Sequence, residues 1–411
     1  MVKICLVMIV KNEEKIITRM LDSVRNLIDC AMIVDTGSID NTISKMEKWF
    51  ESNHLSYKIE IEHFVNFSFN RTNSLDKAAI IYPDVDYYLL SDADHVWYLK
   101  NFDKSLLQAD AYYIKQSEKN ATLTYECWNC RLLSAKKKWK CVGLTHEYWV
   151  CQYPNIISNK LYNVYIDDIA DGGSKENKFI RDEFLLTQTI NDNKTQENDK
   201  IRCKFYLGIT YNNMAVKHIT IDYYIKALLC YFDRIDCGGF DEEIYISMLN
   251  IGSCYENIAV KYHNAALDHK PGILQYDGKH YSDAHELLQQ KNFYLDCAYD
   301  AYKRSYNYRP TRAEALYSMV ILERKRGKYK NAYDLCVLGN KILYPKNDLL
   351  LVIPECYSFL FDYEIIICAY YLPSKFNIGF SCAKKLISQP FNIPIHYYLQ
   401  IVRNFEFYLS K

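Results

Sequence analysis

Residues 86–95 read DYYLLSDADH, a short apolar segment that ends in a pair of aspartates. Residues 87–90 fit a buried strand, and Asp92 and Asp94 place two carboxylates where that strand ends. The spacing alone leaves two interpretations open, a metal site and a polar turn, because a second Asp-x-Asp sequence, DVD at 84–86, lies directly upstream. That upstream pair precedes the strand, so we interpret it as part of a solvated turn.

The residues on the amino-terminal side of this strand alternate between buried strands and amphipathic helices. ICLVMIV at 4–10 is typical of a buried parallel strand, and the apolar residues after it recur at helical spacing. Asp40 or Asn41 is expected to cap the second helix. The expected order is strand 4–10, helix 11–28, strand 31–35, helix 41–52, strand 57–64, helix 70–81 and strand 87–90. This order predicts an α/β domain with a doubly wound, mostly parallel sheet and right-handed crossovers.

From about Leu185 onward, patterns typical of strands become rare and apolar residues recur at helical spacing. LGITY at 207–211 and IGSCY at 251–255 share a Gly-x-x-Tyr core, and Ile251 and Met319 are separated by two 34-residue periods. A generic helical bundle is the alternative. We predict an α/β domain over residues 1–185 and an all-α, tetratricopeptide-like repeat domain over 186–411, with residues 261–283 as an insertion.

Composition narrows the class of protein. The 411 residues carry 50 basic and 50 acidic side chains, so bulk charge favours neither nucleic acid nor an anionic membrane as partner. The 15 cysteines are an odd number scattered through apolar segments, which is typical of a reducing compartment. No segment approaches the ~20 apolar residues of a membrane helix. We therefore expect a cytoplasmic protein, in its own cell or in a host cell, with no integral membrane segment.

Polar motifs follow the predicted strands, at positions where a doubly wound sheet binds ligands. Asn12 and Glu13 follow the first strand, Asp35 and Ser38 the second, and Asp92 and Asp94 the fourth. The motifs are KNEE (11–14), VDTGSIDNT (34–42), NFSFNRTN (66–73), SDAD (91–94), RLL (131–133), THEYW (145–149) and DGGSKENKFIRD (171–182).

Together these motifs resemble the inverting glycosyltransferases of family 2, which have the GT-A fold. The resemblance extends over nearly the whole chain, and it is greater to the subgroup with tetratricopeptide-like repeats that includes the sublancin S-glycosyltransferase group. It implies a metal-dependent transferase that takes a sugar from a nucleotide-diphospho-sugar, in the first place a UDP-sugar. The acceptor would be a protein, peptide or glycan held through the repeat domain.

The resemblance also implies roles for individual residues. Asp94 would bind Mn²⁺ or Mg²⁺ with Asp92 beside it, since a divalent ion neutralises the departing diphosphate. Asp35 would accept hydrogen bonds from uracil or ribose, and the backbone around Val10 would contact the base. Arg71 would face phosphate or hold the neighbouring loop. The residues expected to bind the donor are Val10, Asn12, Glu13, Asp35, Gly37, Ser38, Arg71, Asp92, Ala93 and Arg131.

The sequence departs from the family pattern in two places. Asn66 stands where relatives often have an aspartate, so that carboxylate is missing. The segment YIDDIADGGS (165–174) lacks the histidine that completes the metal site in many relatives. Asp168 or Asp171 would then supply the ligand, because Mn²⁺ and Mg²⁺ accept oxygen donors readily.

Inversion requires a base that deprotonates the acceptor. Glu147 is the candidate, and His146 is either the second candidate or a phosphate ligand, while a buried polar pair that closes a loop is the alternative to both. Two other functions compete: a repeat-based binding or scaffold protein with an inactive transferase domain, and a sugar-phosphate nucleotidyltransferase. The KNEEK sequence lacks the glycine-rich loop expected of the latter. The sugar, the acceptor atom and the oligomeric state, a dimer among the options, stay open.

Overall fold

The chain forms two compact units that are not contiguous in sequence. The first comprises Met1–Asn120 and Tyr125–Cys203, and the second comprises Ala121–Thr124 and Lys204–Lys411. The computed structural model describes residues 2–120, 122–172, 178–218, 220–268, 274–276, 278–281 and 283–410. The predicted domain boundary at 185/186 stays a prediction.

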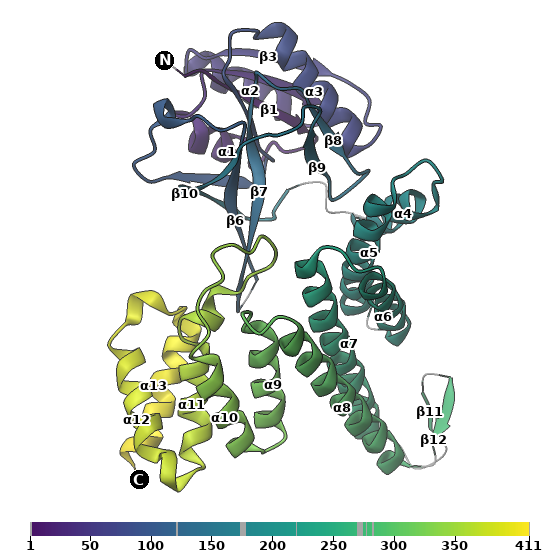
Figure 1. The fold of residues 1–411 in the computed structure, drawn as a ribbon, viewed down its shortest axis with the longest axis vertical. Coiled ribbons are helices and arrows are strands. Elements are labelled where there is room, and N and C mark those ends of the chain that lie inside the picture. Colours follow the sequence, from purple (N-terminus) through teal and green to yellow (C-terminus); the bar gives the residue numbers. More distant parts are fainter. Residues whose placement is uncertain are drawn as a thin grey trace. The chain divides into compact units, whose positions relative to one another are not determined.

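The first unit is built on an eight-stranded mixed sheet with the order β3-β2-β1-β4-β7-β6-β10-β5 (Figure 1). The strands are β1 (Ile4–Val10), β2 (Cys30–Asp35), β3 (Ser56–Ile61), β4 (Tyr87–Leu90), β5 (His95–Leu99), β6 (Ala111–Lys119), β7 (Thr124–Ser134) and β10 (Ser158–Asp168). Strands β1 to β4 pair in parallel. In the other half β6 and β10 are parallel, whereas β7 and β5 run antiparallel to β4 and β10. The predicted class, an α/β region with a mostly parallel sheet followed by a helical region, is confirmed.

Helices cover both faces of the parallel half. They are α1 (Ile17–Val24), α2 (Thr42–Ser52) and α3 (Phe67–Ile81). Alternate side chains of β1 point to opposite faces, as pleating requires. Leu6 and Met8 pack with α1 and α2 in one core, whereas Cys5 and Val7 pack with α3 in the other. Because β1 has apolar side chains on both faces, it suits the centre of a sheet that helices cover on both sides.

Strand β1 lies between β2 and β4, so the strand order reverses beside it. A reversal of this kind opens a crevice outside the carboxyl ends of the two diverging strands. The residues after Val10 and Leu90 border this crevice. The polar motifs of the sequence thus lie where an open α/β sheet binds its ligands.

The first helix is shorter than predicted, because it begins at Ile17 and not near Lys11. The N–H of Glu13 donates to Thr42 Oγ1 at 2.7 Å, and the N–H of Glu14 donates to Asp40 at 3.2 Å. Asn12 has a φ of 57°, which is outside the helical range. The backbone N–H groups of Glu13 and Glu14 therefore donate to side chains of the loop after β2, and the helix begins only after them.

The next two helices begin at polar side chains. Asp40 Oδ1 accepts from the N–H of Thr42 at 3.0 Å, whereas the Asn41 side chain makes no capping bond. Asn66 caps α3 by accepting from the N–H of Phe69 at 2.8 Å. Asn66 therefore has a structural role at a helix start.

The strands after Leu90 were not predicted from the sequence. Strands β5, β6, β7 and β10 complete the main sheet, and β8 (Trp139–Val142) pairs with β9 (Tyr148–Cys151) in a separate hairpin. The helix α4 (Lys178–Asn191) follows. In the sequences of these strands, polar and aromatic residues obscure the period-2 alternation of apolar and polar residues by which a strand is recognised.

The second unit consists mainly of helices, and successive helices from α6 onward pack against each other (Figure 1). They are α5 (Glu197–His218), whose residues up to Cys203 belong to the first unit, α6 (Ile221–Asp236), α7 (Asp241–Leu267), α8 (Ala284–Tyr308), α9 (Glu314–Lys325), α10 (Tyr329–Gly339), α11 (Leu360–Tyr370), α12 (Phe376–Ile387) and α13 (Ile395–Leu409). A short pair, β11 (Leu274–Tyr276) and β12 (Lys279–Tyr281), lies between α7 and α8 in sequence. None of the helices in the described ranges is both long and apolar enough to cross a bilayer.

The glycines of the two Gly-x-x-Tyr sequences lie against aromatic rings. A Cβ on Gly208 of α5 would lie 2.6 Å from the ring of Tyr231, and one on Gly252 of α7 would lie 2.4 Å from Tyr302. Only glycine allows these close approaches. The tetratricopeptide assignment stays a prediction. Parts of the predicted insertion, residues 269–273, 277 and 282, lie outside the described residues.

Candidate functional site

The loops after β1 and β2 are hydrogen-bonded to each other. The N–H of Asn12 donates to Ser38 Oγ at 2.8 Å, and Asn12 Oδ1 accepts from the N–H of Ile39 at 2.9 Å. Gly37, between them in the turn, has a φ of 100°, which favours glycine. These bonds bring Asn12, Gly37 and Ser38 together at the carboxyl edge of the sheet, as the sequence predicts.

Asp35 is buried at the end of β2, with 1% of its surface exposed. Its Oδ1 accepts from the N–H groups of Gly37 at 2.9 Å and Ser38 at 2.7 Å. Its Oδ2 has no hydrogen-bond partner among the described residues. An unpaired buried carboxylate oxygen is costly, and a ligand N–H or O–H would satisfy it.

The carbonyl of Val10 is already engaged within the chain. It accepts from the N–H of Thr36 at 2.8 Å and from Thr36 Oγ1 at 3.1 Å, which uses both of its lone pairs. A contact between this part of β1 and a base would therefore involve other atoms than that oxygen.

Asp92 lies between two arginines. Arg71 Nη2 donates to its Oδ1 at 2.5 Å, and Arg131 Nη1 donates to its Oδ2 at 3.1 Å. Burial opposes ionisation, but the two guanidinium charges outweigh it and hold the pKa of Asp92 well below its usual range. The first aspartate of the SDAD motif is therefore ionised and neutralised by protein groups.

Arg71 contacts a second carboxylate, that of Glu147. Its Nε lies 2.5 Å from Glu147 Oε1, so one guanidinium links the end of β4 to the loop after β8. Burial opposes the charge of Arg71, but Asp92 and Glu147 outweigh it and raise the pKa of Arg71 above its usual value. Of the two predicted roles of Arg71, these contacts match that of holding the neighbouring loop.

Asp94, His95 and Asp168 form a cluster of donor groups. Their ligand atoms all lie within 4.8 Å of one another. Asp168 is opposite His95 where β10 pairs with β5, and Gln116 Nε2 and the N–H of Ala170 donate to its two oxygens at 2.7 and 3.0 Å. Burial raises the pKa of Asp168 above its usual value, which a nearby cation would reverse.

Asp171, the other predicted ligand, lies in a different environment. Its two oxygens accept from Arg19 at 2.7 and 2.8 Å in a bidentate pair. Of the two aspartates considered from sequence, Asp168 is the one beside Asp94. Gly173 and Ser174 of the same motif lie outside the described residues.

The donor set suits a hard divalent cation such as Mn²⁺ or Mg²⁺, which prefers oxygen ligands. Burial lowers the pKa of His95 to about 3, so this side chain is neutral at neutral pH. Its Nδ1 accepts from the N–H of Asp92 at 3.1 Å, which leaves the proton on Nε2. In that tautomer His95 is a donor beside Asp92, and the carboxylates of Asp94 and Asp168 are the groups that fit a cation.

Glycine at position 172 lets the chain lie against two carboxylates. A Cβ there would lie 3.3 Å from both Asp94 Oδ2 and Glu13 Oε1. The N–H of Ile169 donates to the carbonyl of Asp94 at 3.1 Å, which joins the end of β10 to the SDAD motif. Glu13 therefore lies near the cluster, whereas Ala93 is buried in the adjoining core.

The loop between β8 and β9 carries His146 and Glu147. Thr145 Oγ1 donates to Asp182 Oδ1 at 3.2 Å, and His146 Nε2 lies 4.0 Å from Asp182 Oδ2. The carbonyl of Leu144 accepts from the N–H of Phe67 at 3.4 Å. Burial lowers the pKa of His146 to about 4, so it is neutral near pH 7. This loop, joined to α3 and α4, holds Glu147 against Arg71.

Three residues of this network were not identified from the sequence: His95, Gln116 and Asp182. His95 directly follows the SDAD motif, which was a usable signal. Gln116 accepts from Arg131 at 3.0 Å and donates to Asp168, and Asp182 binds the loop of Glu147. Only strand pairing and helix packing bring these two side chains to the site.

No family model matches this chain, and no curated protein matches it. A crystal structure of S. aureus TarS 1–349 is similar at 12% identity over 68% of this chain and 95% of that chain, with a TM-score of 0.32. A crystal structure of S. aureus TarS matches at 13% identity over 67% and 57%, with a TM-score of 0.30. The complex of TarS 1–349 with UDP matches at 13% over 74% and 90%, with a TM-score of 0.27. At these identities and TM-scores the likeness supports no conclusion about what this chain does.

Proposed function

We propose that this chain is a metal-dependent, inverting glycosyltransferase. It would transfer a sugar from a nucleotide-diphospho-sugar, a UDP-sugar in the first place, to a protein, peptide or glycan acceptor. The observation that carries the proposal is the pair Asp94 and Asp168 at the carboxyl edge of the sheet. Asp94 follows β4, one of the two strands that diverge where the strand order reverses, and the pairing of β10 with β5 brings Asp168 to it.

Donor binding would use groups on both sides of that point. Asp35 Oδ2, which is buried and without a partner among the described residues, would accept a hydrogen bond from the base or the ribose. Asp94 and Asp168 would hold the divalent ion, with Asp92 kept in place by Arg71 and Arg131. When bound, the ion would neutralise the diphosphate leaving group.

In the transfer step Glu147 would act as the base. The acceptor hydroxyl, amide or thiol would lose its proton to the Glu147 carboxylate, and its heavy atom would bond to the anomeric carbon. The bond from that carbon to the phosphate oxygen would break at the same time, and its electron pair would leave with the nucleoside diphosphate. The protonated glutamic acid would no longer pair with Arg71, which would keep Asp92 as its partner.

One observation favours the competing function of a binding protein with an inactive transferase domain. Both oxygens of Asp92 and one oxygen of Glu147 are engaged by arginines in the chain itself. Such a protein would bind UDP and Mn²⁺ without ever cleaving a UDP-sugar. Cleavage therefore separates the two functions.

The metal assignment predicts a contrast between three aspartates. Isothermal titration should show that Mn²⁺ strengthens UDP binding to the unmodified chain and to Asp171→Ala. Asp94→Ala and Asp168→Ala should lose that strengthening by at least about tenfold, since each removes one carboxylate from the site. Asp171→Ala is the matched control, because its half-exposed pair with Arg19 is expected to contribute little stability.

A parallel thermal unfolding measurement shows whether each variant folds. The proposal is wrong if UDP binds the unmodified chain equally well with Mn²⁺ and with a chelator. If Asp171→Ala loses the metal effect and Asp168→Ala keeps it, the carboxylate that binds the ion together with Asp94 is Asp171. UDP binding without release of UDP from any UDP-sugar would identify a binding protein.

A further inference from the structure

Gln116 on β6 connects two parts of the candidate site through one primary amide. Its Nε2 donates to Asp168 Oδ2 at 2.7 Å. Its Oε1 accepts from Arg131 Nη2 at 3.0 Å and from Asn129 Nδ2 at 2.9 Å. The side chain is half-buried, so these three bonds are partly shielded from water.

The chemistry of its neighbours fixes the orientation of this amide. A guanidinium has donors only, and an ionised carboxylate has acceptors only. The reversed amide would place its NH₂ group against Arg131 and its oxygen against Asp168, so neither bond could form. Gln116 therefore has one favourable orientation, and Asn129 supports it with a second donor to the same oxygen.

Strand pairing brings these groups to one face of the sheet. Strand β6 lies between β7 and β10, and Gln116 is opposite Ile166 in the pairing with β10. Asp168 is two residues beyond Ile166, and Asn129 and Arg131 are two residues apart on β7. Residues two apart on a strand point to the same face. Gln116 can thus contact both neighbouring strands with one side chain.

The hydrogen bonds of Gln116 extend those of the first SDAD aspartate. Arg71 and Arg131 donate to the two oxygens of Asp92, and the second terminal nitrogen of Arg131 donates to Gln116. The bonds therefore run without interruption from Arg71 to Asp168. We call these five side chains, Arg71, Asp92, Arg131, Gln116 and Asp168, the arginine–glutamine network.

Charges of opposite sign alternate along the network as far as Gln116, which is neutral. Asp92 has two guanidinium partners. Asp168 accepts only from uncharged groups, the amide of Gln116 and the N–H of Ala170, and it has no ion-pair partner among the described residues. The network thus orients Asp168 without neutralising it.

Other residue types at position 116 would change the charge balance. A lysine would bring its own cation to Asp168, and a glutamate would repel it. An apolar side chain would remove one donor from Asp168 and one acceptor from Arg131. Glutamine is the residue type that bonds to both and leaves the negative charge of Asp168 available to a cation.

We propose that Gln116 is a positioning residue for the metal site. It holds the Asp168 carboxylate beside Asp94 and keeps Arg131 on Asp92, so that a divalent cation and not an arginine neutralises Asp168. This proposal rests on the proposed function, to which it adds a residue that acts through Asp168.

Two variants of the full-length chain test this role. Gln116→Met keeps an unbranched side chain of similar length but has no amide. Gln116→Asn keeps the amide but is one carbon shorter, so it cannot reach both Asp168 and Arg131. It also preserves the polarity of the position, which makes a loss of folding less of a concern.

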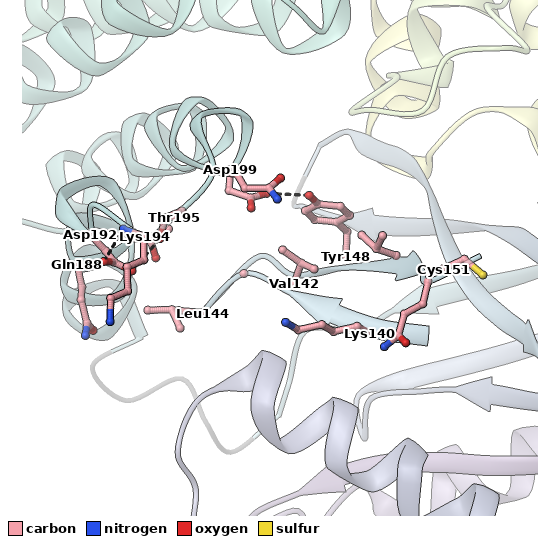
Figure 2. A pocket seen from close by; sticks show the side chains of 15 residues that line it. Lys140, Val142, Leu144, Tyr148, Cys151, Gln188, Asp192, Lys194, Thr195 and Asp199 are labelled. Atoms are coloured by element: carbon pink, nitrogen blue, oxygen red, sulfur yellow. Dashed lines mark hydrogen bonds between the residues drawn. The ribbon is translucent and has the colours of Figure 1, made fainter. Parts of the chain in front are cut away.

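Gln188→Met is the matched control, because it makes the same chemical change outside the network. Figure 2 shows Gln188 on α4 beside a pocket of about 660 Å³. No member of the arginine–glutamine network is among the described residues that line this pocket. Gln188 is exposed, so its substitution should leave the protein folded.

Three measurements are made on each variant. Electron paramagnetic resonance of free Mn²⁺ gives the affinity for Mn²⁺ alone. Isothermal titration gives the affinity for UDP, once with a chelator and once with Mn²⁺. Thermal unfolding shows whether the variant folds.

Both Gln116 variants should bind Mn²⁺ about tenfold more weakly than the unmodified chain, the lower end of the loss that follows when the partner of a metal ligand is removed. Gln188→Met should bind Mn²⁺ as the unmodified chain does. UDP binding in chelator should stay within about twofold in all of them, because Asp35 shares no partner with the network. A general disturbance of the strands would weaken UDP binding in chelator as well.

A combination with Asp168→Ala shows whether Gln116 acts through that carboxylate. In the Asp168→Ala background, Gln116→Met should change the affinity for UDP with Mn²⁺ by no more than about twofold, because the group that it positions is already absent. Full additivity of the two losses overturns the assignment.

The role of Gln116 is also wrong if the folded variants bind Mn²⁺ as tightly as the unmodified chain. It is wrong as well if they lose UDP binding equally with Mn²⁺ and with chelator. In these cases the unmodified chain still binds Mn²⁺, so the proposed function stands. If the unmodified chain binds no Mn²⁺, the proposed metal site is wrong and the role of Gln116 with it.

Discussion

Arg71 connects the two halves of the candidate site at the scale of single residues. Its guanidinium contacts Asp92, at the end of β4, and Glu147, on the loop between β8 and β9. The carboxylate that would take a proton is thus one side chain away from the motif that would bind the donor. If protonation removes the charge of Glu147, Arg71 still has Asp92, so no buried cation is left without a partner.

Substitution of Glu147 by glutamine is the test of the base. Glu147→Gln should keep Mn²⁺-dependent UDP binding but lower transfer by about 10²–10⁴-fold, the range that general bases supply. His146→Gln is the comparison, because His146 Nε2 lies 4.0 Å from Asp182 Oδ2 whereas Glu147 lies beside Arg71. The measurement is UDP release in the presence of an acceptor peptide. Loss of transfer in His146→Gln with retention in Glu147→Gln would assign the base to His146.

At the scale of elements, glycine lets helices of the second unit approach each other closely. Gly208 lies against Tyr231, Gly252 against Tyr302 and Gly339 against Phe361, with each ring belonging to the next helix. Alanine stabilises an isolated helix by about 1 kcal/mol relative to glycine. At these three positions alanine should instead destabilise the protein, because its Cβ would overlap an aromatic ring.

Gly252→Ala should therefore destabilise the second unit, by roughly 1–3 kcal/mol, because its Cβ would lie 2.4 Å from the Tyr302 ring. Far-ultraviolet circular dichroism during urea unfolding measures this change. Adding Tyr302→Leu should restore part of the loss, and the double-mutant cycle gives the coupling energy. If Gly252→Ala is as stable as the unmodified chain, α7 and α8 can move apart to admit the Cβ without loss of free energy of unfolding, and the prediction is wrong.

At the scale of the molecule, the partly buried His146 and the buried His95 make stability depend on pH. Burial lowers the pKa of His146 to about 4, whereas a histidine in the unfolded chain titrates near 6.5. The unfolded state therefore binds the proton first as the pH falls. The stability from this group is complete above pH 6.5 and is lost between pH 6.5 and about 4.

The free energy of unfolding of the first unit should fall by on the order of 1–2 kcal/mol between pH 7.5 and 4.5 because of His146. All five tryptophans, Trp49, Trp97, Trp128, Trp139 and Trp149, belong to the first unit, so their fluorescence during urea unfolding reports on it alone. His146→Gln should reduce the pH dependence but keep the part due to His95, whose pKa burial lowers to about 3. An unchanged slope in His146→Gln would show that His146 titrates normally.

The parallel half of the sheet was predictable because its signals are local. Short apolar runs mark β1, β2 and β4, alternation marks β3, and helical spacing marks the helices between them, so the order of these elements could be read without knowledge of any contact. The start of α1 was not predictable in this way. Its donors are occupied by Thr42 and Asp40, side chains that approach only when β1 and β2 pair.

The amino-acid sequence settles which polar side chains follow which strands, and therefore that Asn12, Asp35 and Asp94 belong at one edge of a parallel sheet. It does not settle their partners. Asp168 reaches Asp94 because β10 pairs with β5 and β6, while Asp171, three residues later, turns away to Arg19. Arg71 reaches Glu147 because the loop after β8 is held against α3 and α4. Local patterns specify strands and helices, but the pairing of groups distant in sequence depends on which strands become neighbours.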